Sequence, residues 1–259
     1  MLLKKIVANC QAELTIQKLL VPPAEMKQQA FSQPPPLDFK GALKGEGISL
    51  IAEVKKASPS RGIIRRNFDA VAIAKSYALG GAAAISVITE SEYFQGNLDY
   101  LPQIKKAIGS KAIPLLRKDF ILDPYQIYQA RAYSADALLL IVSLLSAQKL
   151  HNLLSLSEEL GMQCLVEVHR ENEVKTALEA GASIIGINNR NLETFEIDIE
   201  TTGRLRPLIP SGIIVVAESG IKDAADIEKM RRWGLNAVLV GEWLIKGNDV
   251  AARVRELLS

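Results

Sequence analysis

The chain has 259 residues, of which 48% are hydrophobic, a length that suits either one α/β barrel or two smaller domains. Its formal net charge of +2 at pH 7 gives no sign of a nucleic-acid or membrane-surface partner. None of its apolar runs is long enough to cross a bilayer, so we expect no membrane association.

The first 46 residues are predicted to form an N-terminal helical extension and linker. Residues 2–20 carry apolar side chains at helical spacing, interrupted by polar residues, which favours an amphipathic helix over a signal peptide. Residues 21–36 are rich in Pro and Gln and predict a linker over the surface. Residues 39–43 predict a short helix before the first strand.

From residue 48 onward, strand-like apolar runs alternate with helical patterns, several of which end in Gly. The predicted strands cover residues 48–55, 83–89, 113–119, 137–142, 164–168, 183–188, 213–217 and 237–240. The predicted helices cover residues 69–81, 98–109, 123–134, 147–161, 171–181, 222–234 and 249–258.

Eight strands that alternate with helices predict a single (β/α)8 TIM barrel over residues 47–259. A doubly wound open sheet is the alternative fold. Such a sheet often has a G-x-G-x-x-G turn after its first strand, and the turn here reads ASPSRG.

Polar residues stand at the ends of the predicted strands and are almost absent from their beginnings. In IAEVKKASPSRG (residues 51–62), Glu53 and Lys55 are two residues apart, so they face the same side of an extended strand. Desolvating such a pair is costly, which favours a function, although a structural ion pair is the alternative. In a barrel the strand ends meet at one mouth, where active sites lie. The predicted mouth contains Glu53, Lys55, Lys118, Glu167, Asn188, Glu218 and Ser219.

The loops after the last two predicted strands carry a second signal, the pairs Ser219-Gly220 and Gly241-Glu242. Barrels often bind phosphate in these loops, and glycine lets backbone N–H groups approach an anion. For either glycine alone, a helix cap or a tight turn is the alternative. Lys55, on the first strand beside the last, can add a positive charge.

Seven motifs in the chain resemble those of the indole-3-glycerol phosphate synthase family and stand in the same order. They are IAEVKKASPSRG, AISVITESEYFQG, LLRKDFILDPYQIYQARA, LVEVH, IGINNRNLETFEID, VAESGI and AVLVGEWL. The resemblance implies a cofactor-free barrel of tryptophan biosynthesis. Such an enzyme converts 1-(2-carboxyphenylamino)-1-deoxyribulose 5-phosphate into indole-3-glycerol phosphate, with release of carbon dioxide and water. Its partners would be this small phosphorylated substrate and, as candidates, other enzymes of the tryptophan pathway.

The resemblance also implies catalytic roles. Lys118 matches the general acid near the carbonyl oxygen, and Glu167 matches the general base. Lys55 matches a second lysine that contacts the phosphate and can exchange protons. Glu53 and Glu218 match carboxylates that stabilise charge or hold the lysines.

Further matched residues would bind the substrate. Asn188 matches a contact to substrate hydroxyls, and Arg190 is placed to meet the anthranilate carboxylate. The residues that match the lining of the anthranilate side are Ser58, Phe94 and Phe120. The residues that match the phosphate cradle are Ser219, Gly220, Gly241 and Glu242.

Other side chains have simpler interpretations. Arg117 and Asp119 flank Lys118 and so point the other way, into strand–helix packing. Glu167 and His169 stand two residues apart, but the chain has only two histidines and no third ligand at a useful spacing, so we expect no metal. Cys10 and Cys164 have no metal or redox spacing, which is typical of a reduced protein of the cytoplasm.

Two other classes of function stay open at this point. In a Schiff-base aldolase, Lys118 or Lys55 would form an imine with a carbonyl substrate, which borohydride would trap. A non-catalytic barrel would bind a sugar phosphate or a partner protein without turnover.

Overall fold

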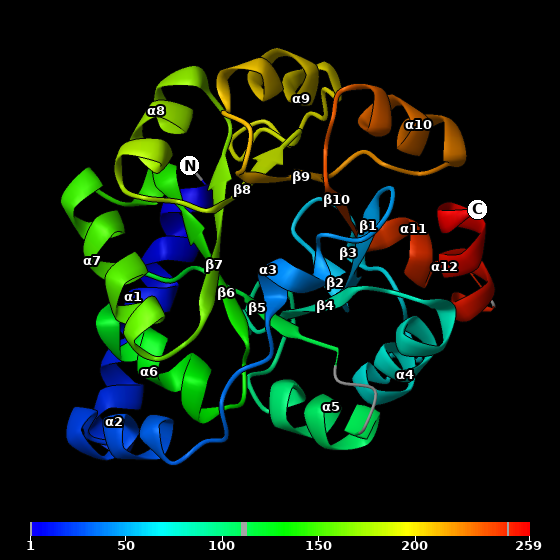
Figure 1. Cartoon of the computed structure of the whole chain (residues 1–259). Coiled ribbons are helices and arrows are strands. Elements are labelled where there is room, and N and C mark those ends of the chain that lie inside the picture. The colour runs from blue at the N-terminus through cyan, green and yellow to red at the C-terminus, as the bar shows by residue number, and fades with distance from the viewer. Residues whose placement is uncertain (1, 110–112, 248) are drawn as a thin grey trace.

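The computed structural model describes residues 2–109, 113–247 and 249–259. Eight parallel strands close into a barrel in the order β1-β10-β9-β8-β7-β6-β5-β4, with helices around it (Figure 1). The barrel strands are β1 (Ser49–Val54), β4 (Ala84–Ile88), β5 (Leu115–Lys118), β6 (Ala137–Ile141), β7 (Gln163–Val168), β8 (Ile184–Asn188), β9 (Ile214–Glu218) and β10 (Ala237–Val240). Each predicted strand corresponds to one of these, so the predicted (β/α)8 barrel is confirmed.

The helices of the barrel follow the predicted pattern with two additions. They are α4 (Ala70–Gly80), α5 (Tyr100–Ile108), α6 (Pro124–Ala132), α7 (Ala147–Glu159), α8 (Glu171–Glu179), α9 (Glu200–Leu205), α10 (Ala224–Arg232), α11 (Glu242–Ile245) and α12 (Val250–Leu258). The additions are α9 and α11, which are too short to show a helical period in the sequence. None of the helices in the described ranges combines the length and apolar character needed to cross a bilayer.

The first turn after β1 contains a small hairpin, formed by β2 (Ala57–Ser58) and β3 (Gly62–Ile63). The turn-forming residues between these two strands were predicted, but the short antiparallel pair was not. The hairpin stands at the edge of the barrel mouth and carries Ser58 there.

The N-terminal extension contains α1 (Leu2–Leu20), α2 (Pro23–Phe31) and α3 (Phe39–Ala42). The prediction of a linker over residues 21–36 is wrong, because α2 occupies most of it. Pro23 stands in the first helical turn, where its missing N–H is not needed, and the Ala, Met and Gln residues that follow are good helix formers. Met26 is buried in a cluster with Leu14 of α1 and Tyr125 of α6. Figure 1 shows α2 lying beside α6.

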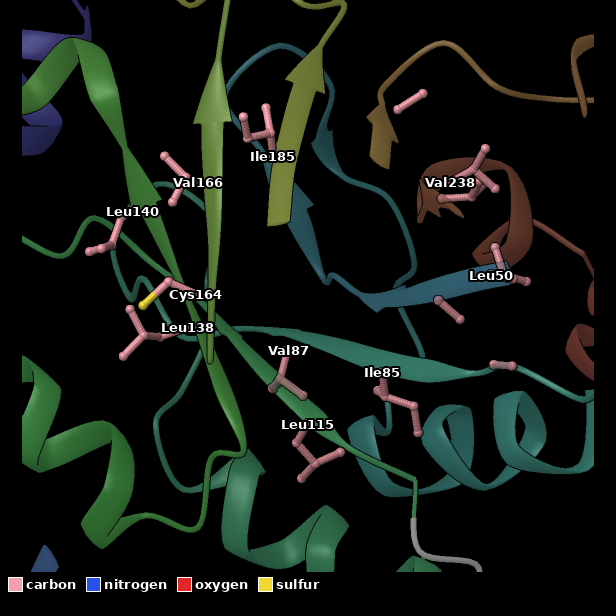
Figure 2. Packing of buried hydrophobic residues seen from close by; sticks show 14 of the residues in the cluster. Leu50, Ile85, Val87, Leu115, Leu138, Leu140, Cys164, Val166, Ile185 and Val238 are labelled. Carbon is pink, nitrogen blue, oxygen red and sulfur yellow. The ribbon is translucent and has the colours of Figure 1, made fainter. Parts of the chain in front are cut away.

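The side chains of each barrel strand alternate between two cores. Outward side chains pack against the surrounding helices, as Leu50, Leu138, Val166, Ile185 and Val238 do in Figure 2. Inward side chains form a second cluster inside the barrel, which includes Ile51, Leu116, Leu165, Ile184, Val216 and Leu239. On four strands the next inward position is charged, because Glu53, Lys118, Glu167 and Glu218 follow Ile51, Leu116, Leu165 and Val216 by two residues, so the alternation that builds the core also brings charged groups to the mouth.

Asp136, which precedes β6, ties the extension to the barrel. Its buried carboxylate accepts hydrogen bonds from the backbone N–H groups of Leu37 at 2.8 Å and Leu115 at 2.7 Å. It also forms an ion pair with Lys105 of α5 at 2.5 Å. One side chain therefore joins the linker, a barrel strand and a helix. The division of the chain into an extension of residues 1–46 and a barrel of residues 47–259 stays a prediction.

We expect Asp136→Ala to lower the free energy of unfolding by about 3 kcal/mol, because it leaves buried backbone donors without an acceptor. Urea denaturation followed by circular dichroism measures the change. Lys175→Ala is a matched control in an exposed pair with Glu179, and it should change the free energy by no more than about 0.5 kcal/mol. A loss for Asp136→Ala as small as that of the control would contradict the structural role of this carboxylate.

Candidate active site

A cavity of about 340 Å³ opens at the carboxyl ends of the barrel strands. Every residue that the sequence assigned to the site lines it. The residues are Glu53, Lys55, Ser58, Phe94, Lys118, Phe120, Glu167, Asn188, Arg190, Glu218, Ser219, Gly220, Gly241 and Glu242. Four of the charged members lie two residues beyond inward apolar positions: Glu53, Lys118, Glu167 and Glu218. The strand period therefore explains why these side chains converge.

At the centre of the cavity, the ammonium of Lys118 lies between two carboxylates. Its Nζ atom is 3.4 Å from Oε2 of Glu167 and 3.3 Å from Oε2 of Glu218. The side chains of the two glutamates are 1% and 2% exposed, and that of Lys118 is 16% exposed. Burial alone would lower the pKa of Lys118, but Glu218, Glu167 and Glu53 together raise it above the usual range. Lys118 is therefore a protonated acid that faces the cavity.

The pKa values of the two carboxylates are shifted in opposite directions. Burial raises the pKa of both, but Lys118, His169 and Asn188 outweigh burial at Glu167 and hold its pKa below the usual range. Glu218 has fewer partners, so burial raises its pKa to about 8 even though Lys118 opposes the shift. One carboxylate is thus ionised, while the other readily holds a proton near neutral pH.

The predicted pair on the first strand is confirmed as an ion pair. Nζ of Lys55 lies 2.5 Å from Oε2 of Glu53, and Glu53 is buried. Burial would raise the pKa of Glu53, but Lys55 and Lys118 lower it below the usual range. The pairing of β1 with β10 also confirms that Lys55 follows a strand next to the Gly241 loop.

Gly186 makes room for Glu218 and was not predicted from the sequence. It lies on β8, where it pairs in register with Val216 of β9. A Cβ atom at position 186 would collide with Oε1 of Glu218. A glycine at an inward position near a strand end, beside a strand that ends in a carboxylate, is the signal that could have identified it.

The loop after β9 is held in an unusual backbone conformation. Ser219 has φ of +67°, in the left-handed region that non-glycine residues rarely occupy, and Gly220 has φ of +87°. Asn189 donates a hydrogen bond to the carbonyl of Ser219 at 3.0 Å, and the Ser219 hydroxyl donates to Oδ1 of Asn188 at 2.8 Å. The sequence reasoning missed Asn189, although the adjacent asparagines of INNRN are the visible signal.

The predicted anthranilate side contains a pair of aromatic rings. Phe94 and Phe120 are tilted against each other, with ring centroids 6.3 Å apart. The guanidinium of Arg190 donates to the carbonyl of Phe195 at 3.1 Å and also lines the cavity. This side of the mouth therefore combines aromatic surface with one positive charge.

The rim contains residues that the sequence reasoning did not assign to the site. Lys222, Trp243 and Lys246 all line the cavity. Lys246 lies 2.6 Å from the Glu242 carboxylate, which Arg61 approaches to 3.5 Å, so two cations offset this negative charge. Lysines in short loops carry no periodic signal, which is why they were missed.

The expected packing of Arg117 on the helix side of its strand is confirmed. Arg117 and Asp119 form a buried ion pair at 2.8 Å on the helix side of β5. Both cysteines are free and buried. Within the described ranges, no group of three or more His, Cys, Asp or Glu residues is placed to hold a metal ion.

Glu218 gives the stability of the fold a pH dependence whose sign follows from its raised pKa. The pKa is about 8 in the folded chain against an ordinary value of 4.5, so between these values only the folded state holds the proton. The stabilisation from this group is complete below about 4.5 and is lost as the pH rises through about 8.

We expect Glu218→Gln to remove this decline. The measurement is the difference between the free energies of unfolding of the wild type and the variant, obtained from urea titrations at several pH values. Glu159→Gln, at an exposed position of α7, is the control. A wild-type-minus-variant difference that is constant from pH 4.5 to pH 8 would mean that Glu218 is ionised throughout.

Comparisons with known proteins agree with this geometry. The sequence profile described as "Indole-3-glycerol phosphate synthase" matches residues 3–257. The protein of that name from Dehalococcoides mccartyi is 54% identical over 259 residues, with 100% of both chains covered. The one from Roseiflexus sp. is 49% identical over 262 residues, covering 99% of this chain and 97% of the relative.

Among solved structures, 3-hexulose-6-phosphate synthase from Salmonella typhimurium superimposes with a TM-score of 0.66 at 14% identity. The match covers 81% of this chain and 96% of that one, and at this identity it supports the barrel fold alone. The sequence matches carry more weight than this structural match, because they extend over the whole chain at high identity. The chain belongs to the indole-3-glycerol phosphate synthase family.

Proposed function

We propose that the barrel mouth carries out indole-3-glycerol phosphate synthesis with Lys118 as the general acid and Glu167 as the general base. The activity follows from family membership, whereas the roles of the residues are our assignment. One observation carries it: the Lys118 ammonium lies between two buried glutamates, whose surroundings lower the pKa of Glu167 and raise that of Glu218. Groups whose pKa values are driven apart in one cavity suit acid and base roles.

The first step needs an acid. The aromatic ring of the substrate attacks the ribulose carbonyl carbon, and the carbonyl oxygen gains a proton as the carbon–carbon bond forms. Lys118 is suited to give that proton, because its ammonium is buried, charged and free to reach into the cavity between its two carboxylate partners. Loss of carbon dioxide, whose bonding electrons return to the ring, then restores aromaticity.

The last step removes water and needs a base. Glu167 is ionised in the free protein, so it can accept the proton that the substrate loses, while the hydroxyl group takes a proton from Lys55 and leaves as water. Its low pKa makes it a weak base while Lys118 is charged. When Lys118 has given up its proton, the positive charge 3.4 Å away disappears and the pKa of Glu167 rises. The first proton transfer therefore prepares the base for the step that follows.

We place the substrate phosphate at the loops after β9 and β10. Backbone N–H groups of Gly220, Gly241 and Glu242 would bind it, with Lys55 nearby at the end of β1. The two lysines of the rim, Lys222 and Lys246, would add positive charge. The anthranilate ring would then lie toward Phe94 and Phe120.

The charge state of the lysines argues against an aldolase. An imine forms only from a neutral amine, and enzymes that use one lower the pKa of the lysine. Here three carboxylates raise the pKa of Lys118 instead. Lys55 is engaged in its ion pair with Glu53. Lys118 is therefore unsuited to form an imine, and the Lys55 side chain is already occupied by a partner.

The location and the pathway partners stay predictions. Two free thiols, both buried, support a cytoplasmic protein. Association with other enzymes of the tryptophan pathway rests on the function alone.

Replacing the proposed base tests the assignment. Glu167→Gln keeps the size of the side chain but cannot accept the proton, so turnover should fall by roughly 10²–10⁴ with little change in KM. Indole fluorescence measures the rate with the carboxyphenylamino substrate. The exposed control Glu159→Gln should retain the wild-type rate. Turnover near the wild-type value in Glu167→Gln would rule out the base role.

Replacing Lys118 and replacing Lys55 should change different kinetic constants. Lys118→Met removes an interaction that strengthens in the transition state, so it should mainly lower kcat. Lys55→Met removes a contact to the phosphate, so it should raise KM, with a further loss in kcat if this lysine also moves protons. Circular dichroism verifies that both variants fold. A Lys118→Met variant with normal kcat, beside an inactive Lys55→Met variant, would reverse the two roles.

A further inference from the structure

His169 lies two residues beyond Glu167, directly after β7, and contacts two carboxylates from different elements. Its Nε2 atom is 3.2 Å from Oε1 of Glu167, on β7. Its Nδ1 atom is 3.4 Å from Oε2 of Glu173, on α8. The backbone N–H of His169 donates to the same oxygen of Glu173 at 2.6 Å. The imidazole therefore bridges the proposed base and the helix behind it.

These two ion-pair distances favour a proton on each ring nitrogen. A neutral imidazole carries one N–H, so one of the two carboxylates would face a lone pair. An imidazolium donates toward both. The side chains of Glu167 and Glu173 are 1% and 10% exposed. Water therefore cannot easily supply the hydrogen-bond donor that a neutral imidazole would lack.

The charged groups around the ring favour the same state. Burial alone would lower the pKa of His169, but Glu167 and Glu173 raise it to about 10. Arg170 lies near Glu173, where it offsets part of the charge on that carboxylate. Lys118, from β5, faces the other oxygen of Glu167 and not the imidazole.

The two oxygens of Glu167 thus have different partners. Oε1 faces His169 at 3.2 Å, and Oε2 faces Lys118 at 3.4 Å. When Oε1 is held in place, the carboxylate has one orientation, and Oε2 points into the cavity. A carboxylate held by only one partner, at the end of a flexible side chain, would populate several rotamers.

We propose that His169 is a positioning residue for the reaction: as an imidazolium anchored by Glu173, it holds Oε1 of Glu167 and so aims Oε2 at the site of proton transfer. The inference rests on the proposed role of Glu167 as the base. It assigns a task in the reaction to the helix α8, which itself contributes no group to the cavity lining.

The test combines kinetics with nuclear magnetic resonance of the imidazole groups. The chain has two histidines, so His151→Gln, at an exposed position of α7, assigns both imidazole signals and is also the kinetic control. In the wild type, the His169 imidazole should stay doubly protonated up to about pH 10. Loss of its proton below pH 7 would overturn the proposal without any variant of the site.

The kinetic series uses His169→Ala and His169→Gln. His169→Ala should lower kcat by roughly 10- to 100-fold, the effect of losing a hydrogen bond to a charged group. KM should stay within about twofold, because no substrate contact is lost. The acid limb of the kcat/KM profile should move up by about 1 pH unit, since the pKa of Glu167 rises. His169→Gln, whose amide can still donate to Glu167, should recover part of kcat.

The outcomes separate this proposal from the function on which it rests. If Glu167→Gln is inactive while His169→Ala keeps the wild-type kcat and pH profile, the positioning role is wrong and the base assignment stands. If Glu167→Gln is fully active, the base assignment itself fails. A His169→Gln variant that is folded but no more active than His169→Ala would also contradict the proposal.

Discussion

The contact on which the site depends is the buried ammonium of Lys118 between the carboxylates of Glu167 and Glu218. None of these groups is tolerable alone in a desolvated cavity, and removing one would leave the others unbalanced. Two further pairs of opposite charge surround these groups: Lys55 with Glu53, and His169 with Glu173. Because each charge holds its neighbours in place, the protonation state of one group controls the pKa of the next. Loss of a proton from Lys118 therefore raises the pKa of Glu167. A reaction in which an acid step is followed by a base step needs such coupling.

The barrel supplies the rigidity that this charge cluster requires. Each central group stands at the end of a strand that is hydrogen-bonded on both sides, and Asn188 pairs in register with Glu218. Positions on strands hold side chains more closely than loops do. Asp136, far from the cavity, secures the extension against the barrel. In the mechanism we propose, the loops at the mouth bind the substrate, whereas the strand ends carry the groups that react.

The sequence predicted the barrel from strands that alternate with helices. It placed Glu53, Lys118, Glu167 and Glu218 in one mouth because polar residues stand at the strand ends, which meet there in a barrel. Ser58, Phe94 and Phe120 were predicted only from the resemblance to the family. The prediction failed at α2, because Pro and Gln are common in linkers, whereas here Pro23 stands in the first helical turn and Gln is a good helix former. It also missed Gly186 and the bridge formed by His169, since these depend on contacts between elements that no local pattern encodes. Opposite pKa shifts of two similar glutamates likewise arise only from the assembled charges.

The account can be tested most directly by a crystal structure of the protein with bound indole-3-glycerol phosphate. It predicts the phosphate within hydrogen-bond distance of the backbone N–H groups of Gly220 and of Gly241 or Glu242. It also predicts the indole ring beside Phe94 and Phe120, with Lys118 and Glu167 facing the carbon atoms that react. Phosphate density at the opposite side of the mouth, or a product whose reacting carbons lie out of reach of Lys118 and Glu167, would contradict it.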